Sequence, residues 1–283
     1  MAAMGKVMMG SAKERVMTTD ADKSAARSEL LKCVRQNPVF AGLSKAAASD
    51  VLDAARVRTV AAQDAIIRQG DEACAFGILL SGRAKMVQVT PDGRQVLIRY
   101  IVTGQEYGLI AALRGYTYPL TIEAVETCAV LCWPGARLAE FFARYPQVSL
   151  NALHIMVIRN QELQLRYREL LTDRVEQRLA RALLRLSTIA GEHTAGGTLI
   201  TLSLTREDLA ELIGATLFTV SRTLSQWEQA GYVDGGRERI RICRPDALEQ
   251  LAGDLDSFSP TCLSPCALVD LMISRRHAPA VPA

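Results

Sequence analysis

The feature that most limits the possible folds is a long helical stretch in the middle of the chain. From Pro146 to Leu171 the residues read PQVSLNALHIMVIRNQELQLRYRELL, and mainly apolar positions recur at alternating steps of three and four. This is the spacing of a coiled-coil seam. The seam consists of Leu153, Met156, Asn160, Leu163, Tyr167 and Leu170.

A helix over residues 146–172 would be about 35 to 40 Å long at 1.5 Å per residue, which is more than a small domain can cover. A second copy of the same helix is the natural cover, so we expect a dimerisation helix here. Asn160 would then lie inside the seam, where a polar pair costs stability but fixes the register and a two-stranded state. The alternative, a single amphipathic helix that packs on its own domain, stays open.

Short β-strands are predicted on the N-terminal side of this helix, from about Arg56 to Trp133. Apolar residues alternate in AKMVQV and QVLIRYIV, the turn TPDGR joins the two segments, and glycines recur. This pattern is typical of an antiparallel roll or barrel. Short helices precede it, with Ser44 as a helix cap. We therefore expect residues 29–145 to form a β domain with flanking helices, and residues 1–28 to be a disordered leader.

Helical patterns return after the long helix, over residues 173–252. An amphipathic helix and a strand-like GGTLITLSLT come first. Thr205 and Asp208 then mark the start of one helix, and Thr216 caps another that runs to about Ala230. Two helices joined by a short turn that contains Gly match the helix-turn-helix, whose second helix can lie in a DNA major groove.

A hairpin-like segment, YVDGGRERIRICR, follows the two helices. We expect Gly-Gly at its turn and Arg237, Arg239 and Arg241 alternating onto one face. Such a hairpin is the wing of a winged helix-turn-helix, although the helices alone would also fit an ordinary helical hairpin. The predicted fold class is therefore α+β, with an N-terminal β unit, a long helix and a C-terminal winged helix-turn-helix.

Composition and motifs exclude several function classes. The formal charge is only +3, and no apolar run approaches the roughly 18 residues that cross a bilayer. The N-terminus lacks a secretory signal pattern, so we expect a cytoplasmic protein without a membrane partner. No nucleophile, base and orienting group fall together and no metal-ligand spacing stands out, so we expect neither an enzyme nor a metal site.

These motifs together resemble a known family, the Crp/Fnr-type transcription regulators. The resemblance covers residues 38–252 and is most specific in VEQRLARALLRLS and LTREDLAELIGATLFTVSRTLSQWEQAGYV, while QGDEACAFGILLSGRAKM is similar to the family's sensor. It implies a double-stranded β-roll of the cupin or jelly-roll kind as the sensor domain. It also implies a bacterial homodimer that binds a pseudo-palindromic promoter site and contacts RNA polymerase, with the sensor state transmitted through the long helix.

The resemblance also implies which positions contact DNA. Arg222 matches an arginine of the family, and its planar fork can donate two hydrogen bonds to a guanine. Phe218 departs from the glutamate that many relatives carry, so it would favour a thymine methyl over cytosine, or else turn into the core. The expected contacts are Thr205 and Arg206 at phosphates, Thr216 and Thr219 at phosphates or bases, and Phe218, Ser221 and Arg222 near bases.

The charge of the C-terminal module leaves a second function open. Residues 172–252 contain ten arginines, no lysine and eleven acidic residues, a formal charge of −1. A positively charged patch must then be confined to a few arginines, because the module as a whole is not basic. The alternative is an effector-sensing module that acts mainly through protein contacts, with weak or degenerate DNA readout.

The sequence indicates the effector less clearly than it indicates the DNA-contacting residues. Relatives that bind cyclic nucleotides use a Gly-Glu segment and an Arg-Ser or Arg-Thr pair. Glu106 and Gly108 are retained here, but Tyr118 and Pro119 replace the pair, so we do not expect cyclic AMP in the usual mode. An iron–sulfur cluster is not expected either, because Cys33 is the only cysteine upstream of the roll. Haem stays open without an assigned ligand. The expected effector pocket comprises Glu106, Gly108, Tyr118 and Leu163.

Residues 253–283 form a tail of unknown role. Ser264-Pro265 can start a short helix with Cys266 in its first turn and Cys262 just upstream. A redox pair, or half of a metal site shared across a dimer, is one interpretation, and ordinary packing is the other.

Overall fold

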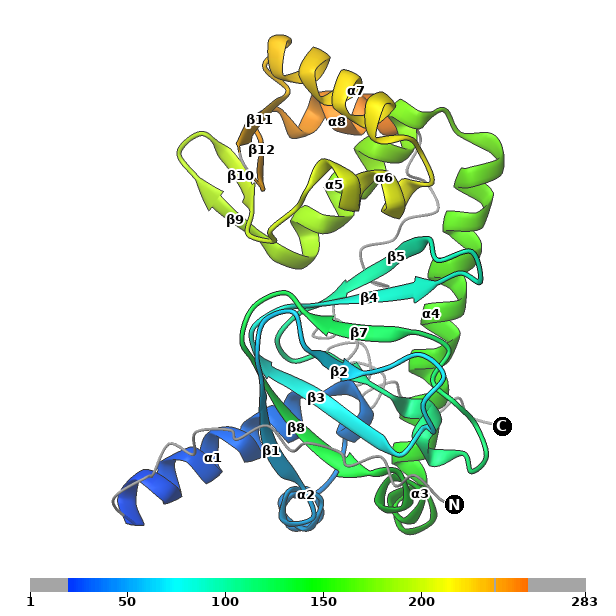
Figure 1. Cartoon of the computed structure of the whole chain (residues 1–283). Coiled ribbons are helices and arrows are strands. Elements are labelled where there is room, and N and C mark those ends of the chain that lie inside the picture. Colours follow the sequence, from blue (N-terminus) through cyan, green and yellow to red (C-terminus); the bar gives the residue numbers. More distant parts are fainter. Residues whose placement is uncertain (1–19, 237, 254–283) are drawn as a thin grey trace, which may run out of the picture.

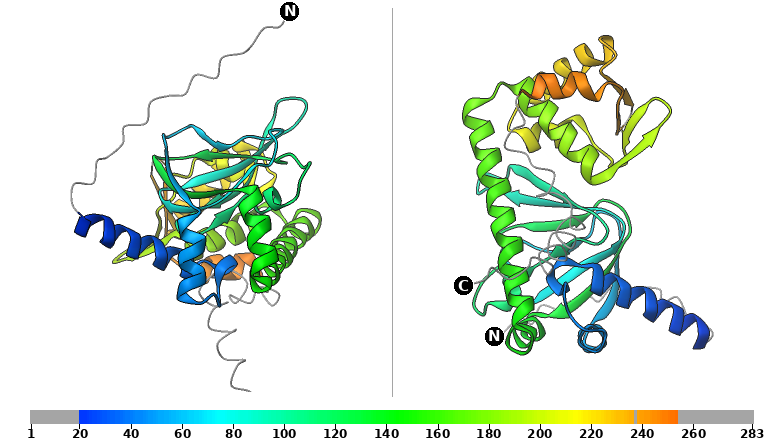
Figure 2. Two further views of the ribbon diagram at one scale, coloured as in Figure 1. Left: turned by 90° about the horizontal axis from the view of Figure 1, so that it is seen from below. Right: turned by 180° about the vertical axis from the view of Figure 1, so that it is seen from behind.

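A β-roll and a smaller helical module lie at opposite ends of one long helix (Figures 1 and 2). The computed structural model describes residues 20–236 and 238–253. The long helix, α4 (Pro146–Thr172), runs beside the roll and ends at the C-terminal module (Figure 1). This arrangement confirms the predicted fold class. Within the described ranges, no helix is both long enough and apolar enough to cross a membrane.

Helix α1 (Asp20–Gln36) corrects the predicted N-terminal boundary. Residues 20–28 are helical, so the expectation of a disordered leader is wrong for them. Arg27 contacts α2 (Lys45–Asp53), where its guanidinium pairs with Asp53 at 2.6 Å and donates to Ser49 Oγ at 2.8 Å. This contact joins the two helices, and no local sequence pattern reveals it. Residues 1–19 lie outside the described residues.

Eight antiparallel strands form the roll as two four-stranded sheets. The predicted hairpin around TPDGR is present, with β4 paired to β5 from Ala84↔Ile101 to Val89↔Gln95. One apolar cluster draws residues from both sheets, and a second, centred on Phe40, Phe76 and Trp133, joins the first sheet to the surrounding helices. The sheet orders are β1-β8-β3-β6 and β2-β7-β4-β5, and the strands are β1 (Arg56–Val60), β2 (Ala65–Ile67), β3 (Ala75–Ser81), β4 (Ala84–Val89), β5 (Gln95–Ile101), β6 (Glu106–Tyr107), β7 (Thr121–Ala124) and β8 (Cys128–Pro134).

Short helices connect the roll to the long helix. Helix η2 (Leu109–Ala112) follows β6, and α3 (Gly135–Arg144) leads from β8 to α4. Helix α4 begins at Pro146, a residue suited to the first helical position, and its bounds match the predicted 146–172. Asn151 attaches it to η1 (Pro38–Phe40), because its side-chain amide donates to the carbonyls of Val39 at 3.0 Å and Ala41 at 2.9 Å.

The C-terminal module combines four helices with a small four-stranded sheet of order β11-β12-β10-β9. The predicted helix-turn-helix is formed by α6 and α7, and strand β9 and helix α8 add to the predicted elements. The elements are α5 (Val175–Ala190), β9 (Gly191–Thr194), β10 (Gly197–Ile200), α6 (Arg206–Ile213), α7 (Leu217–Gln229), β11 (Val233–Gly236), β12 (Arg239–Ile242) and α8 (Pro245–Ala252).

The wing hairpin is present, and both glycines lie in its first strand. Gly235 and Gly236 belong to β11, where they pair with Ile240 and Arg239 of β12. A Cβ atom at Gly235 would lie 2.1 Å from Glu228 Oε1 on α7, which is the end of a flexible side chain that can move aside. The expectation of Gly-Gly at the turn is therefore wrong, because both glycines are paired strand residues.

The roll contacts the C-terminal module through its β4–β5 ribbon. Val87, Leu97 and Tyr100 belong to the same buried cluster as Leu209 and Ile213 of α6. The Tyr100 ring is buried, and its hydroxyl lies beside the carboxylate of Asp208 on α6. The sensor fold and the first helix of the helix-turn-helix therefore share one apolar core.

Candidate nucleic-acid interface and sensor cavity

Two threonines fix the starts of the helix-turn-helix helices, as predicted. Thr205 Oγ1 accepts from the Asp208 N–H at 2.9 Å, and the Asp208 carboxylate accepts from the Thr205 N–H at 2.9 Å, which makes a capping box. Thr216 Oγ1 accepts from the Thr219 N–H at 3.2 Å. Gly214 ends α6 in the left-handed conformation at φ 63°, which turns the chain toward α7.

Helix α7 has one buried face and one exposed face. Val220, Leu224 and Trp227 are buried against the module core. Phe218 is 74% exposed, so the alternative in which it turns into the core is wrong. Arg222 is exposed as well, and it makes no ion pair or hydrogen bond within the described part of the chain. The exposed N-terminal part of α7 thus presents an aromatic ring and a guanidinium that has no partner within the described residues.

The other candidate DNA-contacting residues differ in the hydrogen bonds and ion pairs that they make within the chain. Arg206 lies between the two helices, 3.3 Å from Glu228 and 3.5 Å from the Ser221 carbonyl, so a phosphate would share it with Glu228. Thr216 and Thr219 share a hydrogen bond between their hydroxyls at 2.8 Å. The side chain of Ser221 is partly exposed beside Arg222.

The wing arginines are not equivalent. Arg241 pairs with Asp234 at 3.1 Å, whereas Arg239 is exposed on the same face of β12. Arg237 lies outside the described residues. Arg239 and Arg222 are therefore the exposed cations from which a local basic patch can be built, in keeping with the module's low net charge.

The apolar seam of α4 lies open to solvent in the single chain. Leu153, Met156, Leu163, Tyr167 and Leu170 are between 48% and 64% exposed, and Asn160 is exposed among them. The buried side of α4 carries Val148, Ala152 and Ile155, while Met156 and Leu163 of the seam lie at its edge, where they also line a cavity between α4 and the roll. The alternative in which the seam packs on its own domain is therefore wrong for the described chain.

A cavity of about 440 Å³ lies between the roll and α4. All four residues of the expected effector pocket line it: Glu106, Gly108, Tyr118 and Leu163. Three arginines outside the expected set also line it: Arg99, Arg159 and Arg166. Two features of the sequence could have indicated these arginines. One is the arginine within the apolar strand run QVLIRYIV, and the other is the spacing of Arg159, Glu162 and Arg166 along one helix.

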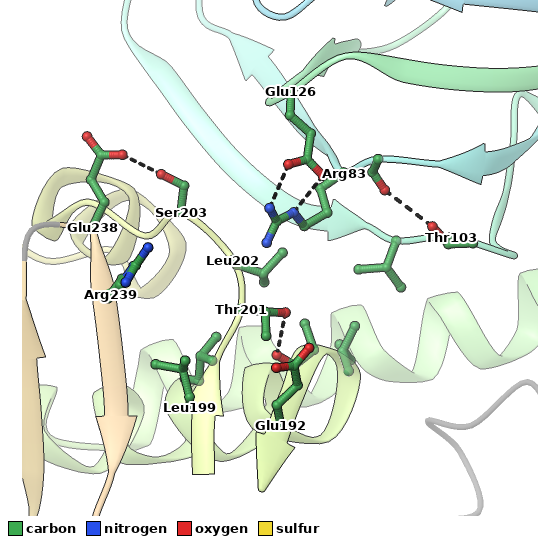
Figure 3. Close-up of a pocket in the computed structure, with 15 residues that line it drawn as sticks. Arg83, Thr103, Glu126, Glu192, Leu199, Thr201, Leu202, Ser203, Glu238 and Arg239 are labelled. Atoms are coloured by element: carbon green, nitrogen blue, oxygen red, sulfur yellow. Dashed lines mark hydrogen bonds and ion pairs between the residues drawn. The ribbon is translucent and has the colours of Figure 1, made fainter. Parts of the chain in front are cut away.

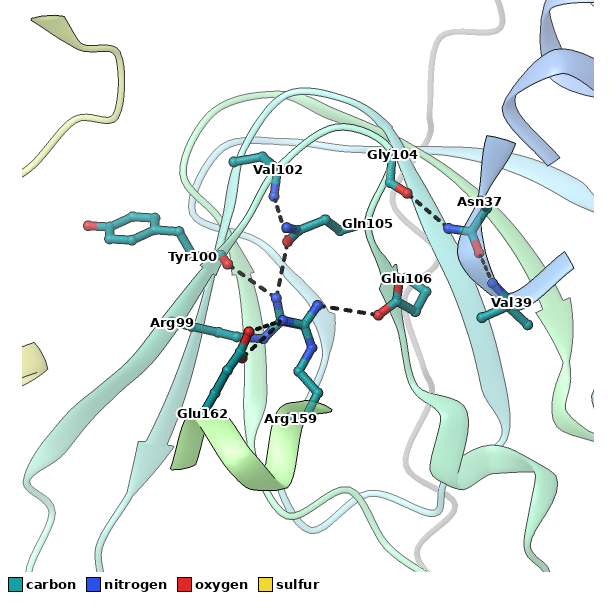
Figure 4. Close-up of polar contacts among 10 residues, drawn as sticks. All are labelled: Asn37, Val39, Arg99, Tyr100, Val102, Gly104, Gln105, Glu106, Arg159 and Glu162. Carbon is teal, nitrogen blue, oxygen red and sulfur yellow. Dashed lines mark hydrogen bonds and ion pairs between the residues drawn. The ribbon is translucent and has the colours of Figure 1, made fainter. Parts of the chain in front are cut away.

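Hydrogen bonds hold the polar wall of this cavity (Figure 4). Arg159 pairs with Glu106 at 3.5 Å and with Glu162 at 3.1 Å. Arg99 donates to Gln105 Oε1 at 3.1 Å and to the Tyr100 carbonyl at 3.4 Å. Burial, followed by the positive charge of Arg159, lowers the pKa of Arg99 to about 9.

A wider gap of about 920 Å³ separates the roll from the C-terminal module (Figure 3). On the roll side, Arg83 pairs with Glu126 at 2.6 Å, and on the module side Ser203 donates to Glu238. These polar groups are satisfied within their own domains. These four side chains thus have partners within their own domains, whereas Arg239, which also lines the gap, is exposed.

Comparison with known protein families identifies both halves of this architecture. Residues 57–145 match the family model of the cyclic nucleotide-binding domain, and residues 177–251 match that of the Crp-like helix-turn-helix domain. The chain belongs to the Crp/Fnr family of transcriptional regulators.

Individual relatives agree with this membership. The chain is 25% identical to the probable transcriptional regulator flp of Lacticaseibacillus casei over 223 residues, which cover 78% of this chain and 98% of the relative. It is 26% identical to the transcriptional activator protein FnrA of Stutzerimonas stutzeri over 198 residues, 70% of this chain and 81% of the relative. The structure of FixK2 from Bradyrhizobium japonicum shares its fold, with a TM-score of 0.62, 22% identity and coverage of 71% and 98%.

The sensor domain of this Crp/Fnr regulator does not fit a cyclic nucleotide in the family's usual mode. Glu106, which would meet a ribose, already contacts Arg159 at 3.5 Å. Tyr118, at the expected position of the phosphate-binding arginine, is fully committed: its hydroxyl donates to the Ala75 carbonyl at 2.7 Å and accepts from the Ala75 N–H at 2.8 Å. At this one position a buried aromatic ring therefore stands in place of a phosphate-binding cation, and the cavity's arginines come from other positions.

Proposed function

We propose that this Crp/Fnr regulator is a homodimer that binds a two-fold symmetric promoter site through α7 and is controlled by the cavity beside α4. The observation that carries the proposal is the exposed N-terminal face of α7, where Phe218 and Arg222 project from a helix that Thr216 caps and whose opposite face is buried in the module core. The first turns of a recognition helix are the part that reaches base edges in a major groove.

The seam supports the homodimer. Five exposed apolar side chains on one stripe of α4 give a contiguous patch, and burying each of them against a partner would contribute about 1.5 to 3 kcal/mol. A two-fold axis along α4 would place two α7 helices to read half-sites about one helical turn of DNA apart. Contact with RNA polymerase and a cytoplasmic location follow from the family relationship and belong to the same proposal.

Selection of binding sites from a random DNA pool tests this function. The protein, Arg222→Ala and Arg114→Ala as a control on the exposed surface of the roll would be compared at two salt concentrations. We expect enrichment of a two-fold symmetric site, with its preference at one base pair of each half-site lost in Arg222→Ala only. Enrichment of no sequence, or a site without symmetry, would contradict the proposal.

One observation favours the second candidate, in which protein contacts are the main output. Leu217 and Phe218 together form an exposed apolar pair at the start of α7, and the module carries a formal charge of −1. Both properties suit a protein surface better than a phosphate backbone. Failure of the C-terminal module and the full chain alike to enrich any DNA would support this candidate.

A further inference from the structure

The cavity beside α4 has an apolar body and a charged end. Its apolar wall is built from the roll by Ile98, Leu109 and Ile122 and from α4 by Ile155, Met156 and Leu163. A volume of about 440 Å³ falls in the range of roughly 300 to 1,000 Å³ that small-molecule sites occupy. The body of a ligand in this space would therefore contact mainly hydrocarbon.

The charged end carries more positive than negative groups. Three guanidiniums line the cavity, those of Arg99, Arg159 and Arg166, against two carboxylates, those of Glu106 and Glu162. Both carboxylates pair with the same arginine, Arg159. Arg99 and Arg166 therefore have no carboxylate partner among the residues that line the cavity, and the wall carries one net positive charge.

Arg99 is the arginine best placed to carry this surplus. Its hydrogen bonds go to neutral oxygens only, and within the described residues no carboxylate lies within 4.0 Å of it. Arg166 also donates to a neutral oxygen, the backbone carbonyl of Ile98, but the negative charge of Glu169, outside the cavity wall, acts on it as well. Burial lowers the pKa of Arg99 to about 9, so the group is still a cation at neutral pH, although a destabilised one.

We propose that this cavity binds a hydrophobic organic monoanion, with a carboxylate against Arg99 and an apolar body between the roll and α4. One carboxylate would neutralise the single surplus charge, and its two oxygens match the fork of a guanidinium. A dianionic phosphate would overcompensate that charge, and an uncharged molecule would leave Arg99 without a counter-ion. A nucleoside would bring polar ribose and base edges into a wall made mainly of aliphatic side chains.

The same ligand would contact the dimer seam. Met156 and Leu163 line the cavity and also belong to the exposed seam of α4. A bound apolar body would restrict these two side chains and the partner helix that packs on them. This link between ligand and dimer rests on the proposed function, whereas binding of the anion itself does not.

The test is a direct binding measurement by isothermal titration calorimetry on the full-length protein without DNA. The probes are octanoate and 3-phenylpropanoate, with 1-octanol, octylammonium, inorganic phosphate and cyclic AMP as comparisons. The variants are Arg99→Gln, Met86→Trp, which fills the apolar part of the cavity, and Arg114→Gln, which removes an exposed arginine elsewhere on the roll. Circular dichroism and thermal unfolding show whether each variant is folded.

We expect at least one of the two carboxylates to bind at one site per chain, at least tenfold more tightly than octanol or octylammonium. Arg99→Gln and Met86→Trp should each weaken that binding at least tenfold, and Arg114→Gln should leave it unchanged. If Arg99→Gln fails to fold, Met86→Trp and the comparison with octanol still test whether the cavity binds a carboxylate. The proposal is wrong if neither carboxylate binds, if octanol binds equally well, or if cyclic AMP binds more tightly and at the same site. Because no DNA is present, either result is independent of the outcome of DNA selection.

Discussion

The carboxylate of Glu169, near the end of α4, accepts two hydrogen bonds from the Arg185 guanidinium on α5, at 2.7 and 3.0 Å. Arg181 adds a third contact to Glu169 at 3.6 Å and also pairs with Asp173 at 3.3 Å. Glu169 is buried, so this ion-pair cluster joins the long helix to the C-terminal module at a site removed from water.

Substitution of Glu169 should therefore destabilise the protein strongly. Glu169→Ala leaves two largely buried guanidiniums without their shared carboxylate, and loss of one partner of a buried pair costs about 3 to 5 kcal/mol. Chemical denaturation followed by circular dichroism measures the loss. Glu140→Ala, which removes an exposed i,i+3 pair with Arg137, is the control and should change the free energy of unfolding by at most about 0.5 kcal/mol. Equal effects of the two changes would contradict the structural role of the cluster.

A charge in the seam should separate the protomers. Leu153 is 62% exposed in the single chain, and Leu153→Glu would place two carboxylates in the interface of a symmetric dimer. Losing the burial of both leucines alone removes about 3 to 6 kcal/mol, which weakens the dimer at least about 100-fold. Sedimentation equilibrium checks this, with the neighbouring off-seam change Gln164→Glu as a control that should remain dimeric. A wild-type chain that is monomeric at micromolar concentration would refute the predicted homodimer.

Arg222 and Arg239 should have different effects on DNA binding. Arg222→Ala is expected to lose about 1 to 3 kcal/mol of discrimination at one base pair of each half-site. Arg239→Ala should instead weaken binding to all sequences alike and, if the arginine neutralises one phosphate, reduce the slope of log K against log salt by about 1. Fluorescence anisotropy with the selected site and a scrambled site, over a series of salt concentrations, distinguishes the two patterns.

Replacing Phe218 should change the preferred half-site rather than the fold. Because the ring is 74% exposed, Phe218→Glu is expected to change the free energy of unfolding by about 0.5 kcal/mol or less. A glutamate can accept a hydrogen bond from cytosine N4, so the variant should gain a cytosine that the wild-type protein does not select. Repeated DNA selection with the variant checks this, and Phe218→Ala shows whether loss of the ring alone explains any change.

The contact between the roll and α6 should become more stable when Glu211 loses its charge. Burial, followed by the charge of Asp208, raises the pKa of Glu211, and its Oε2 atom is buried without a hydrogen-bond partner among the described residues. The folded chain then holds the proton more tightly than the unfolded chain, so stability falls as pH rises through the window between the unfolded pKa near 4.5 and the raised folded pKa.

Glu211→Gln should accordingly raise the melting temperature at pH 7.5 and have a smaller effect at pH 4, where the carboxyl is protonated in both states. Lys85, Gln95, Glu207 and Tyr100 surround the same carboxyl and are present in both proteins. Differential scanning calorimetry at the two pH values checks the sign. A larger gain at pH 4 than at pH 7.5 would contradict the assignment.

The sequence predicted the features that depend on neighbours along the chain. Thr205 and Thr216 cap their helices through N–H groups three residues ahead, and the seam of α4 follows from a period of 3.5. Both were visible without a structure. The four expected pocket residues also line one cavity. They are far apart along the chain, and it was the resemblance to a known family that indicated that they lie together.

Features that depend on distant packing were missed. Arg27 of α1 pairs with Asp53 of α2, and Gly235 of the wing lies close to Glu228 of α7. Arg99 and Arg159 meet across 60 residues of sequence, and no periodicity marks such a pair. The placement of Phe218 was undecided for the same reason, since the side of α7 that faces the core depends on how three helices pack. Cys262 and Cys266 lie outside the described residues.

Met156 and Leu163 belong to two surfaces at once, the wall of the cavity and the seam between protomers. A mutation that reshapes either side chain to admit a new ligand also reshapes the contact with the second copy. At these two positions, the preference for a ligand and the stability of the dimer therefore cannot change independently during evolution. A lineage that acquires a different effector must either compensate elsewhere along α4 or obtain its new preference from the roll side of the wall alone.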